Sequence, residues 1–183
     1  MRIEPKTIEL KGGASALLRT AEPNDAAAIV CYMRTVCAQT DYLLSSSEEW
    51  DDSREEREAE FLETTLQSPN SAMLVCVVDN EIVGTCQVML NRTSPKTYHR
   101  ARVALALLRA YWRRGIGTVM LTRLIDIARE NGATQVELGY LSGNERAKGL
   151  YEKLGFVPTG KLVNAVRLAD GTMLDEIMMV KLL

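Results

Sequence analysis

The segment Arg113-Arg114-Gly115-Ile116-Gly117-Thr118 is the part of the chain whose residue types could bind a phosphate group. Its two glycines let the backbone turn tightly and approach a ligand without side chains in the way. The segment lies between a predicted strand and a predicted helix, so the first free N–H groups and the positive end of the helix dipole would face a pyrophosphate. Its two arginines add positive charge. Taken alone, the pattern is equally compatible with a tight turn flanked by solvated arginines.

Two better-known nucleotide-binding loops do not fit this segment. The dinucleotide-binding fingerprint needs a third glycine three residues after the second, and that position is Met120. A P-loop needs a lysine followed by serine or threonine directly after its last glycine, and that lysine is absent here. The sequence therefore disfavours a nicotinamide site and a P-loop.

A second group of candidate residues lies closer to the C-terminus. Asn144 precedes a predicted helix that contains Tyr151 and is followed by Gly155-Phe156. Asn144 is suited to cap the start of that helix. Tyr151 shares an apolar stripe with Leu150 and is suited to pack in the core with its hydroxyl group at the surface. On local grounds alone, neither residue requires a functional role.

Strands and helices alternate around these candidates, which predicts an α/β fold. The strand Arg100–Leu108 leads into the glycine loop, and the helix after the loop ends at Asn131-Gly132. A short strand over Gln135–Tyr140 and a helix over about Asn144–Leu154 follow. The helix after the loop has apolar residues at helical spacing, namely Met120, Leu121, Leu124, Ile125 and Ala128.

The remaining elements are two helices and three hairpins. One helix begins after Asn24 or Asp25 and runs to about Gln39. The other covers about Asp51–Gln67, with Phe61, Leu62 and Leu66 on its buried side. The predicted hairpins are Thr7–Lys11 with Ala14–Arg19 around Gly12-Gly13, Ala72–Val78 with Ile82–Leu90 around Asp79-Asn80, and Lys161–Leu168 with Thr172–Leu182 around Asp170-Gly171.

The composition is that of an ordinary globular domain. The chain has 183 residues, of which 46% are hydrophobic and 25% charged, with a net charge of −2. This balance gives no attraction toward nucleic acid, and the longest apolar run, Val103–Leu108, is too short to span a membrane. Residues 48–63 hold nine acids against two arginines. That segment is either a solvated helix face or a field that attracts a cationic acceptor.

Four cysteines, Cys31, Cys37, Cys76 and Cys86, are present without a CxxC pair or a nearby histidine, which argues against a zinc site. Cys31 and Cys37 would lie on different faces of one helix, which argues against a bridge between them. We interpret all four as reduced packing residues and expect a cytoplasmic protein without a bound metal.

The order of strand, Gly-x-Gly loop, helix, short strand and Asn144-x6-Tyr151-x3-Gly155-Phe156 resembles the GNAT superfamily of N-acetyltransferases. The resemblance covers roughly Ala16–Leu183 and is strongest over Val103–Val157. The family's loop usually begins with glutamine or arginine three residues before the first glycine, where this chain has Trp112.

The resemblance implies a mixed, mostly antiparallel central sheet flanked by about four helices. The sheet would be splayed at the cofactor site, between the strand that ends at Leu107 and the strand Gln135–Tyr140. Residues 1–183 would form a single N-acetyltransferase domain, with residues 1–15 as an N-terminal hairpin extension.

The resemblance also implies acetyl-CoA as cosubstrate and assigns its contacts. Pantetheine would bond to main chain near Leu105 and Leu107, and Asn144 would contact the cofactor arm. Tyr151 would lie near the thioester sulfur. The pyrophosphate would bind Arg113, Arg114, Gly115, Ile116, Gly117 and Thr118.

Physical chemistry supports Tyr151 as the catalytic acid. The departing thiolate has a reference pKa of about 8.5 and a phenol of about 10, so tyrosine stays protonated at neutral pH and can donate as charge develops. A main-chain N–H near Leu107 could polarise the thioester carbonyl. The base stays open between His99, Asp41, Glu176 and a water chain.

The expected reaction is therefore direct attack of an amine, on a small molecule or a peptide, on the acetyl thioester. The alternative is a non-catalytic acyl-CoA-binding sensor. We expect acceptor choice to depend on the first two helices, their connection at Gln39–Asp52 and the C-terminal hairpin. A homodimer is compatible with that hairpin through Met173, Met178 and Met179.

Overall fold

Eight strands form one sheet in the order β1-β2-β3-β4-β5-β6-β8-β7 in the computed structural model, which describes residues 1–10 and 13–183. Neighbouring strands are antiparallel except for β5 and β6, which are parallel. The strands are β1 (Lys6–Glu9), β2 (Ser15–Thr20), β3 (Ser71–Val78), β4 (Glu81–Leu90), β5 (Arg100–Leu107), β6 (Gln135–Leu141), β7 (Val157–Arg167) and β8 (Met173–Leu182). The predicted mixed, mostly antiparallel sheet is confirmed.

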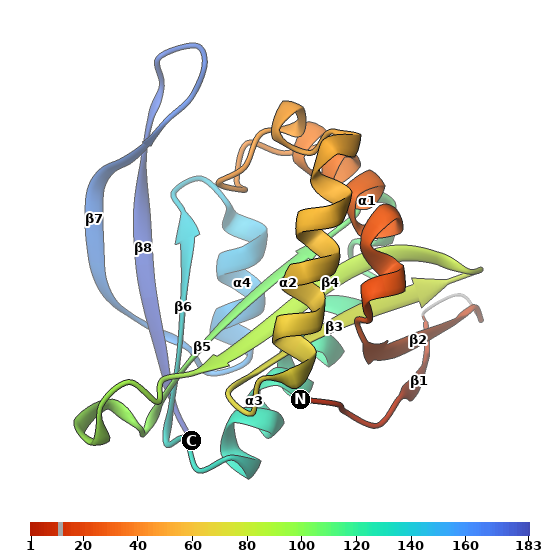
Figure 1. Cartoon of the computed structure of the whole chain (residues 1–183). Coiled ribbons are helices and arrows are strands. Elements are labelled where there is room, and N and C mark those ends of the chain that lie inside the picture. Colours follow the sequence, from red (N-terminus) through yellow and green to blue (C-terminus); the bar gives the residue numbers. More distant parts are fainter. Residues whose placement is uncertain (11–12) are drawn as a thin grey trace.

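Four α-helices cover the two faces of this sheet (Figure 1). The helices α1 (Ala26–Ala38) and α2 (Glu55–Gln67) pack on one face against β3 and β4. The helices α3 (Ile116–Glu130) and α4 (Glu145–Lys153) contribute side chains to a larger core on the opposite face. The fold therefore has a helix layer on each side of the sheet, as the α/β prediction requires.

The helix α3 forms the centre of the larger core. Met120, Leu121 and Leu124 are completely buried, and they repeat at the spacing of one helix face. The helix ends where the sequence predicts, because Gly132 adopts a φ of 78° that other residues rarely reach. Burying a side chain of this size contributes about 1.5–3 kcal/mol, so α3 is fixed mainly by packing.

The turn between β3 and β4 also follows the prediction. Asp79 and Asn80 have φ values of 49° and 67°, the two positive values that a two-residue hairpin turn needs. Gly171 has a φ of 88° in the turn between β7 and β8. The first predicted turn, at Gly12-Gly13, lies partly outside the described residues, because Lys11 and Gly12 are not among them.

The prediction for α2 is wrong in its start and only partly right in its buried face. Asp52–Arg54 form a short 3-10 helix, and α2 begins only at Glu55. Phe61 is 43% exposed and Leu66 is half-buried. Leu62 is buried as predicted, and it shares the buried stripe with Glu58 and Thr65. This stripe follows i, i+4, i+7 spacing but contains a carboxylate and a hydroxyl, so an apolar pattern alone does not locate it.

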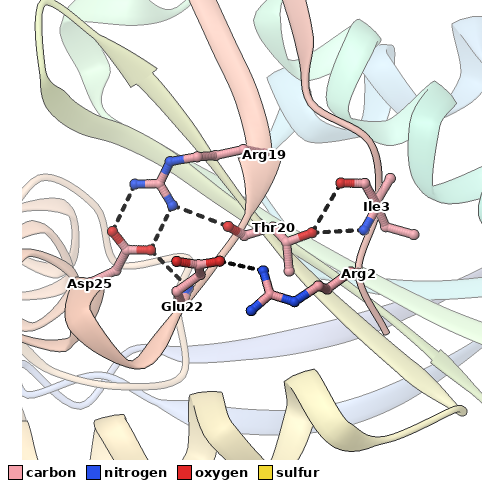
Figure 2. A network of polar contacts seen from close by, with 6 residues as sticks. All are labelled: Arg2, Ile3, Arg19, Thr20, Glu22 and Asp25. Carbon is pink, nitrogen blue, oxygen red and sulfur yellow. Dashed lines mark hydrogen bonds and ion pairs between the residues drawn. The ribbon is translucent and has the colours of Figure 1, made fainter.

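A polar network fixes the entry into α1 (Figure 2). Arg19, at the end of β2, donates two hydrogen bonds of 2.7 Å to the Asp25 carboxylate. Burial opposes the ionisation of Asp25, but Arg19 and the Glu22 N–H outweigh it and hold the pKa of this carboxyl below its ordinary value. Arg2 pairs with Glu22, and the Ile3 N–H donates to Thr20 Oγ1 at 2.8 Å. The network ties the first residues to the β2–α1 connection.

The three methionines of the C-terminal hairpin, which the homodimer hypothesis involves, differ in exposure. Met179 is almost fully buried in the core, and Met178 lines a cavity described below. Met173 alone of the three is exposed, at 44%. Met178 and Met179 are therefore used within the protein, and a homodimer through this hairpin stays a prediction.

Candidate active site

Parallel pairing joins β5 and β6 at the start of both strands, where Arg100–Arg102 pair with Gln135–Glu137. β5 then stays paired with β4 as far as Leu107, while β6 turns away toward β8 (Figure 1). Among the described residues, no ladder pairing joins β5 to β6 beyond Arg102. The sheet is therefore splayed at the position that the resemblance implies.

The backbone of β5 has polar groups that face this opening. The Asn91 N–H donates to the Arg100 carbonyl, and the Leu108 N–H donates to the Val83 carbonyl, so the even-numbered residues of β5 bond to β4. Hydrogen-bonding direction alternates along a strand. The main-chain groups of Val103, Leu105 and Leu107 therefore point toward β6, into the opening.

A cavity of about 500 Å³ occupies this opening, and we call it the slot cavity. It is bounded by β5, the loop before α3, α4, β8 and the end of α1. Its lining residues include most of the predicted site, namely Leu105, Leu107, Arg113, Gly115, Gly117, Thr118, Asn144 and Tyr151. Arg114 and Ile116 do not line it, since Arg114 lies over the Tyr111 ring and Ile116 is fully buried in the core.

The glycine loop turns sharply into α3. Arg113 and Gly115 have φ values of 60° and 92°, and α3 begins at Ile116. Gly115, the N-cap, supplies no side-chain hydrogen bond, so the first N–H groups of α3 are left for a ligand or for water. Gly117 is already helical, and an added Cβ there would lie 3.2 Å from Leu150 Cδ2. The loop therefore presents the geometry of an anion site.

Trp112 organises the charged side chains beside this loop. Its Nε1 donates to the Leu107 carbonyl at 2.8 Å, so this side chain bonds within the protein. The Arg146 guanidinium lies 3.0 Å from the centre of the Trp112 ring, and the Arg109 guanidinium lies 5.4 Å from it. Burial, together with Arg109 and Arg113, lowers the pKa of Arg146. Like charges held this close favour a polyanionic ligand.

Sequence reasoning missed Arg146 and Arg109. Arg146 comes from α4, and Arg109 comes from the short helix after β5, where its side chain also donates to the Gln39 carbonyl at 2.6 Å. Neither residue belongs to a motif. Their positions depend on the packing of distant segments around Trp112, which no local pattern in the sequence encodes.

Asn144 caps α4, as the local interpretation expects. Its Oδ1 accepts a hydrogen bond from the Ala147 N–H at 3.2 Å. Asn144 also lines the slot cavity, so it can cap α4 and still belong to the site. Opposite it, the Tyr42 hydroxyl donates to the Gly143 carbonyl at 2.9 Å and joins the α1–α2 connection to the β6–α4 loop.

Tyr151 lies on the buried face of α4 and is 8% exposed. Its ring packs edge-on against Tyr140 and tilted against Phe156, each at 6.1 Å between ring centres. Burial raises the pKa of Tyr151 to about 12. The phenol is therefore protonated at neutral pH and can donate a hydrogen bond into the slot cavity.

The three base candidates differ in position. Glu176 lines the slot cavity, and its carboxylate occupies the space above Gly139 that a larger residue would fill. His99 is exposed directly before β5, and its carbonyl accepts a hydrogen bond from the Gln135 N–H at 3.0 Å. Asp41 is exposed and does not line the cavity. Of the three, Glu176 alone is brought to the site.

Comparison with known protein families supplies the deciding observation. Residues 38–156 match the model of the Acetyltransferase (GNAT) family. The chain belongs to this GNAT family. The matched region contains α2, β3–β6, α3, α4 and all of the predicted cofactor residues, so the family assignment rests on the part of the fold that forms the slot cavity.

Solved structures agree with this GNAT fold. A GNAT-family acetyltransferase from Streptococcus pneumoniae is 25% identical, with a TM-score of 0.83 over 92% of this chain and 99% of that one. The Salmonella typhimurium protein yncA, solved with its cofactor acetyl-CoA, is 22% identical with a TM-score of 0.76 over 90% and 92%. The Brucella melitensis ribosomal-protein-alanine N-acetyltransferase is 23% identical with a TM-score of 0.78 over 91% and 99%.

Three further features concern membrane spans, metal sites and cysteines. Within residues 1–10 and 13–183, no helix is both long and apolar enough to cross a membrane. Over the same residues, no three His, Cys, Asp or Glu side chains are grouped as a metal site would require. The cysteines of this GNAT protein form no disulfide; Cys31 is exposed and the other three are buried.

Proposed function

We propose that this protein transfers the acetyl group of acetyl-CoA to an amine of a small molecule or a peptide. The observation that carries the proposal is a single cavity that joins an arginine-rich helix start, unpaired strand backbone and a buried neutral tyrosine. These three features match the phosphate, the amide-containing arm and the thioester of acetyl-CoA, in that order. A fold relative solved with acetyl-CoA and another named as an N-acetyltransferase support it.

The binding roles follow from the positions of the side chains. The backbone of Arg113–Thr118 and the arginines around Trp112 would hold the pyrophosphate. The exposed main-chain groups of Leu105 and Leu107 would bond to the pantetheine amides. Because Trp112 already occupies the Leu107 carbonyl, the Leu107 N–H is the group left for the ligand. Asn144 would contact the same arm from α4.

The transfer step needs one acid and one base. The amine nitrogen attacks the thioester carbonyl carbon, a C–N bond forms, and the C–S bond breaks with its electron pair on sulfur. Tyr151 donates a proton or a hydrogen bond to that thiolate. The surplus proton of the attacking amine passes to Glu176, directly or through water, since this carboxylate lines the same cavity. The proposed location is a reducing compartment such as the cytoplasm, which fits the exposed free thiol of Cys31.

The test is release of free thiol from acetyl-CoA over a panel of amines, with the acetylated product identified by mass spectrometry. We expect amine-dependent thiol release together with an N-acetyl product. Tight binding of acetyl-CoA without turnover of any amine would instead indicate the non-catalytic sensor. An O-acetyl product would contradict the assignment to amines.

A further inference from the structure

A second cavity, of about 230 Å³, lies between the sheet and the pair α1 and α2, and we call it the helix-side cavity. It shares a wall with the slot cavity, because Leu43 and the β5 residues Ala104, Leu105 and Ala106 line both. Ala104 and Ala106 pair with Gln87 and Thr85 of β4, which also line the helix-side cavity. A ligand that lies across these two small alanines would therefore reach from one cavity into the other.

The walls of the helix-side cavity are mainly apolar. They are formed by α1, the α1–α2 connection, α2 and the sheet, through Ile29, Met33, Leu43, Phe61, Met73 and the two alanines. The volume is below the range of roughly 300–1,000 Å³ that holds a drug-sized ligand. The space therefore suits one end of a small molecule with an aliphatic body.

Two polar side chains that line this cavity have no hydrogen-bond partner in the part of the chain that the structure describes. Glu58 is 8% exposed, and its carboxyl group makes no hydrogen bond or ion pair with any residue the structure describes. Trp50 is also 8% exposed, and its Nε1 is buried without a hydrogen-bond partner. Most buried polar groups in native proteins are paired, so the buried Trp50 Nε1 is an exception. The Glu58 carboxyl group lines the same small cavity and is accessible from it, so both groups are available to a ligand.

The charge around Glu58 determines the sign of that ligand. Residues 48–63 hold nine acids against two arginines, and α2 lies within this segment. Of these arginines, Arg54 lies over the Trp50 ring at 4.2 Å, outside any ion pair with Glu58. The helix-side cavity is mainly apolar, and its carboxylate comes from α2, which is itself rich in acidic residues. Such a cavity favours a ligand with a cationic group.

We propose that the helix-side cavity binds a second, positively charged nitrogen of the acceptor, with Glu58 as its partner. The inference rests on the proposed acetyl transfer, since the reacting amine must lie in the slot cavity near Tyr151 and Glu176. The nitrogen bound by Glu58 is therefore not the reacting nitrogen. The aliphatic segment that joins these two nitrogens passes over Ala104 and Ala106. The acceptor class is a diamine, or another amine with a distant cationic group. A water that accepts from Trp50 Nε1 completes the site.

The experiment compares 1,4-diaminobutane with n-butylamine, which has the same carbon chain and a single nitrogen. Binding to the protein loaded with CoA is measured by calorimetry, and acetyl transfer is measured by thiol release from acetyl-CoA. We expect the diamine to bind about ten- to a hundredfold more tightly, the range that a hydrogen bond to a charged group provides. In Glu58→Gln that advantage should fall to near one, while binding of n-butylamine stays unchanged.

The matched control is Glu60→Gln, which removes the same charge from an exposed position of α2 and should keep the preference. Ala106→Val is the second variant. It narrows the passage without touching Glu58 and should also remove the diamine advantage. Equal binding of the two amines to the parent protein, or a preference that survives Glu58→Gln, would overturn the inference. Diamine binding that depends on Glu58 without any thiol release would support the cavity assignment and refute the proposed transfer.

Discussion

The slot cavity and the helix-side cavity share a wall but present opposite chemistry. The slot cavity offers free backbone groups, a helix start and a cluster of arginines. The helix-side cavity offers aliphatic side chains and one unpaired carboxyl group. The first can recognise any ligand with the charge and shape of a nucleotide arm, because backbone geometry does most of the recognition. The second depends on individual side chains, so its specificity can change with single substitutions.

The largest expected effect is a loss of turnover without a loss of acetyl-CoA binding in the slot cavity. Tyr151→Phe keeps the ring that packs against Tyr140 and removes only the hydroxyl. If the hydroxyl donates to the departing thiolate, turnover should fall by roughly 10² to 10⁴, with acetyl-CoA affinity near that of the parent. Steady-state rates and a separate binding titration measure the two quantities.

The control for that substitution is Tyr98→Phe, at an exposed residue outside both cavities. Its turnover should equal that of the parent. A Tyr151→Phe variant with nearly normal turnover and a stability loss of about 1 kcal/mol would mean that the hydroxyl has only a structural role.

The next effect tests which cavity holds acetyl-CoA. A ligand that binds only the native state at a hundredfold excess over Kd should stabilise the protein by about 2.7 kcal/mol. Thermal unfolding of the parent and of Glu58→Gln should show the same gain with acetyl-CoA, because Glu58 lines only the helix-side cavity. NADH should give no comparable gain. Equal stabilisation by the two nucleotides would refute the cofactor assignment.

A smaller effect concerns the close packing of the glycine loop. In Gly117→Val the side chain would press on Leu150 and project toward the phosphate site, so acetyl-CoA affinity should fall at least about tenfold, or about 1.4 kcal/mol. The reason is crowding, since Gly117 is helical and the positive φ values of the loop belong to Arg113 and Gly115. The control is Gly149→Val on α4, next to Leu150, where an added Cβ would meet no atom within 4 Å; this variant should bind acetyl-CoA normally. Unchanged affinity in both variants would leave the loop as a simple turn.

The smallest expected effect concerns the stability cost of the helix-side cavity. Burial raises the pKa of the Glu58 carboxyl above its ordinary value of 4.5, and Arg54 offsets part of this. The folded state therefore holds the proton at a pH where the unfolded state has lost it, and the unfolding free energy falls as the pH rises through that window. Glu58→Gln should match the parent protein below about pH 4 and be about 1 kcal/mol more stable at neutral pH.

Urea unfolding of both proteins between pH 4 and pH 8 checks this. Glu60→Gln should show no such pH-dependent gain, because Glu60 is exposed. A stability difference between Glu58→Gln and the parent that is constant with pH would show that the Glu58 carboxyl is not strained by burial.

The sequence predicts the donor half of the site better than the acceptor half, for a physical reason. The strand β5, the turn at Gly115, the helix α3 and the cap at Asn144 each follow from residues near one another in the chain. By contrast, the buried position of Glu58 and the placement of Arg146 over Trp112 depend on how distant segments pack. The exposure of Phe61 has the same cause, because an apolar residue that faces a cavity has the same local pattern as one that faces the core.

The alternating bonds of β5 have a consequence for the exchange of amide hydrogens with solvent. The N–H groups of Ala104 and Ala106 are paired with β4, whereas those of Leu105 and Leu107 face the slot without a strand partner. Exchange of the first pair requires local opening of the sheet, and exchange of the second pair breaks no ladder bond. In the free protein, deuterium uptake should therefore rise and fall from one residue to the next along a single strand. A ligand bound in the slot cavity should slow the exchange of the Leu105 and Leu107 amides. All amides of β5 would then exchange slowly, and the two-residue period would disappear.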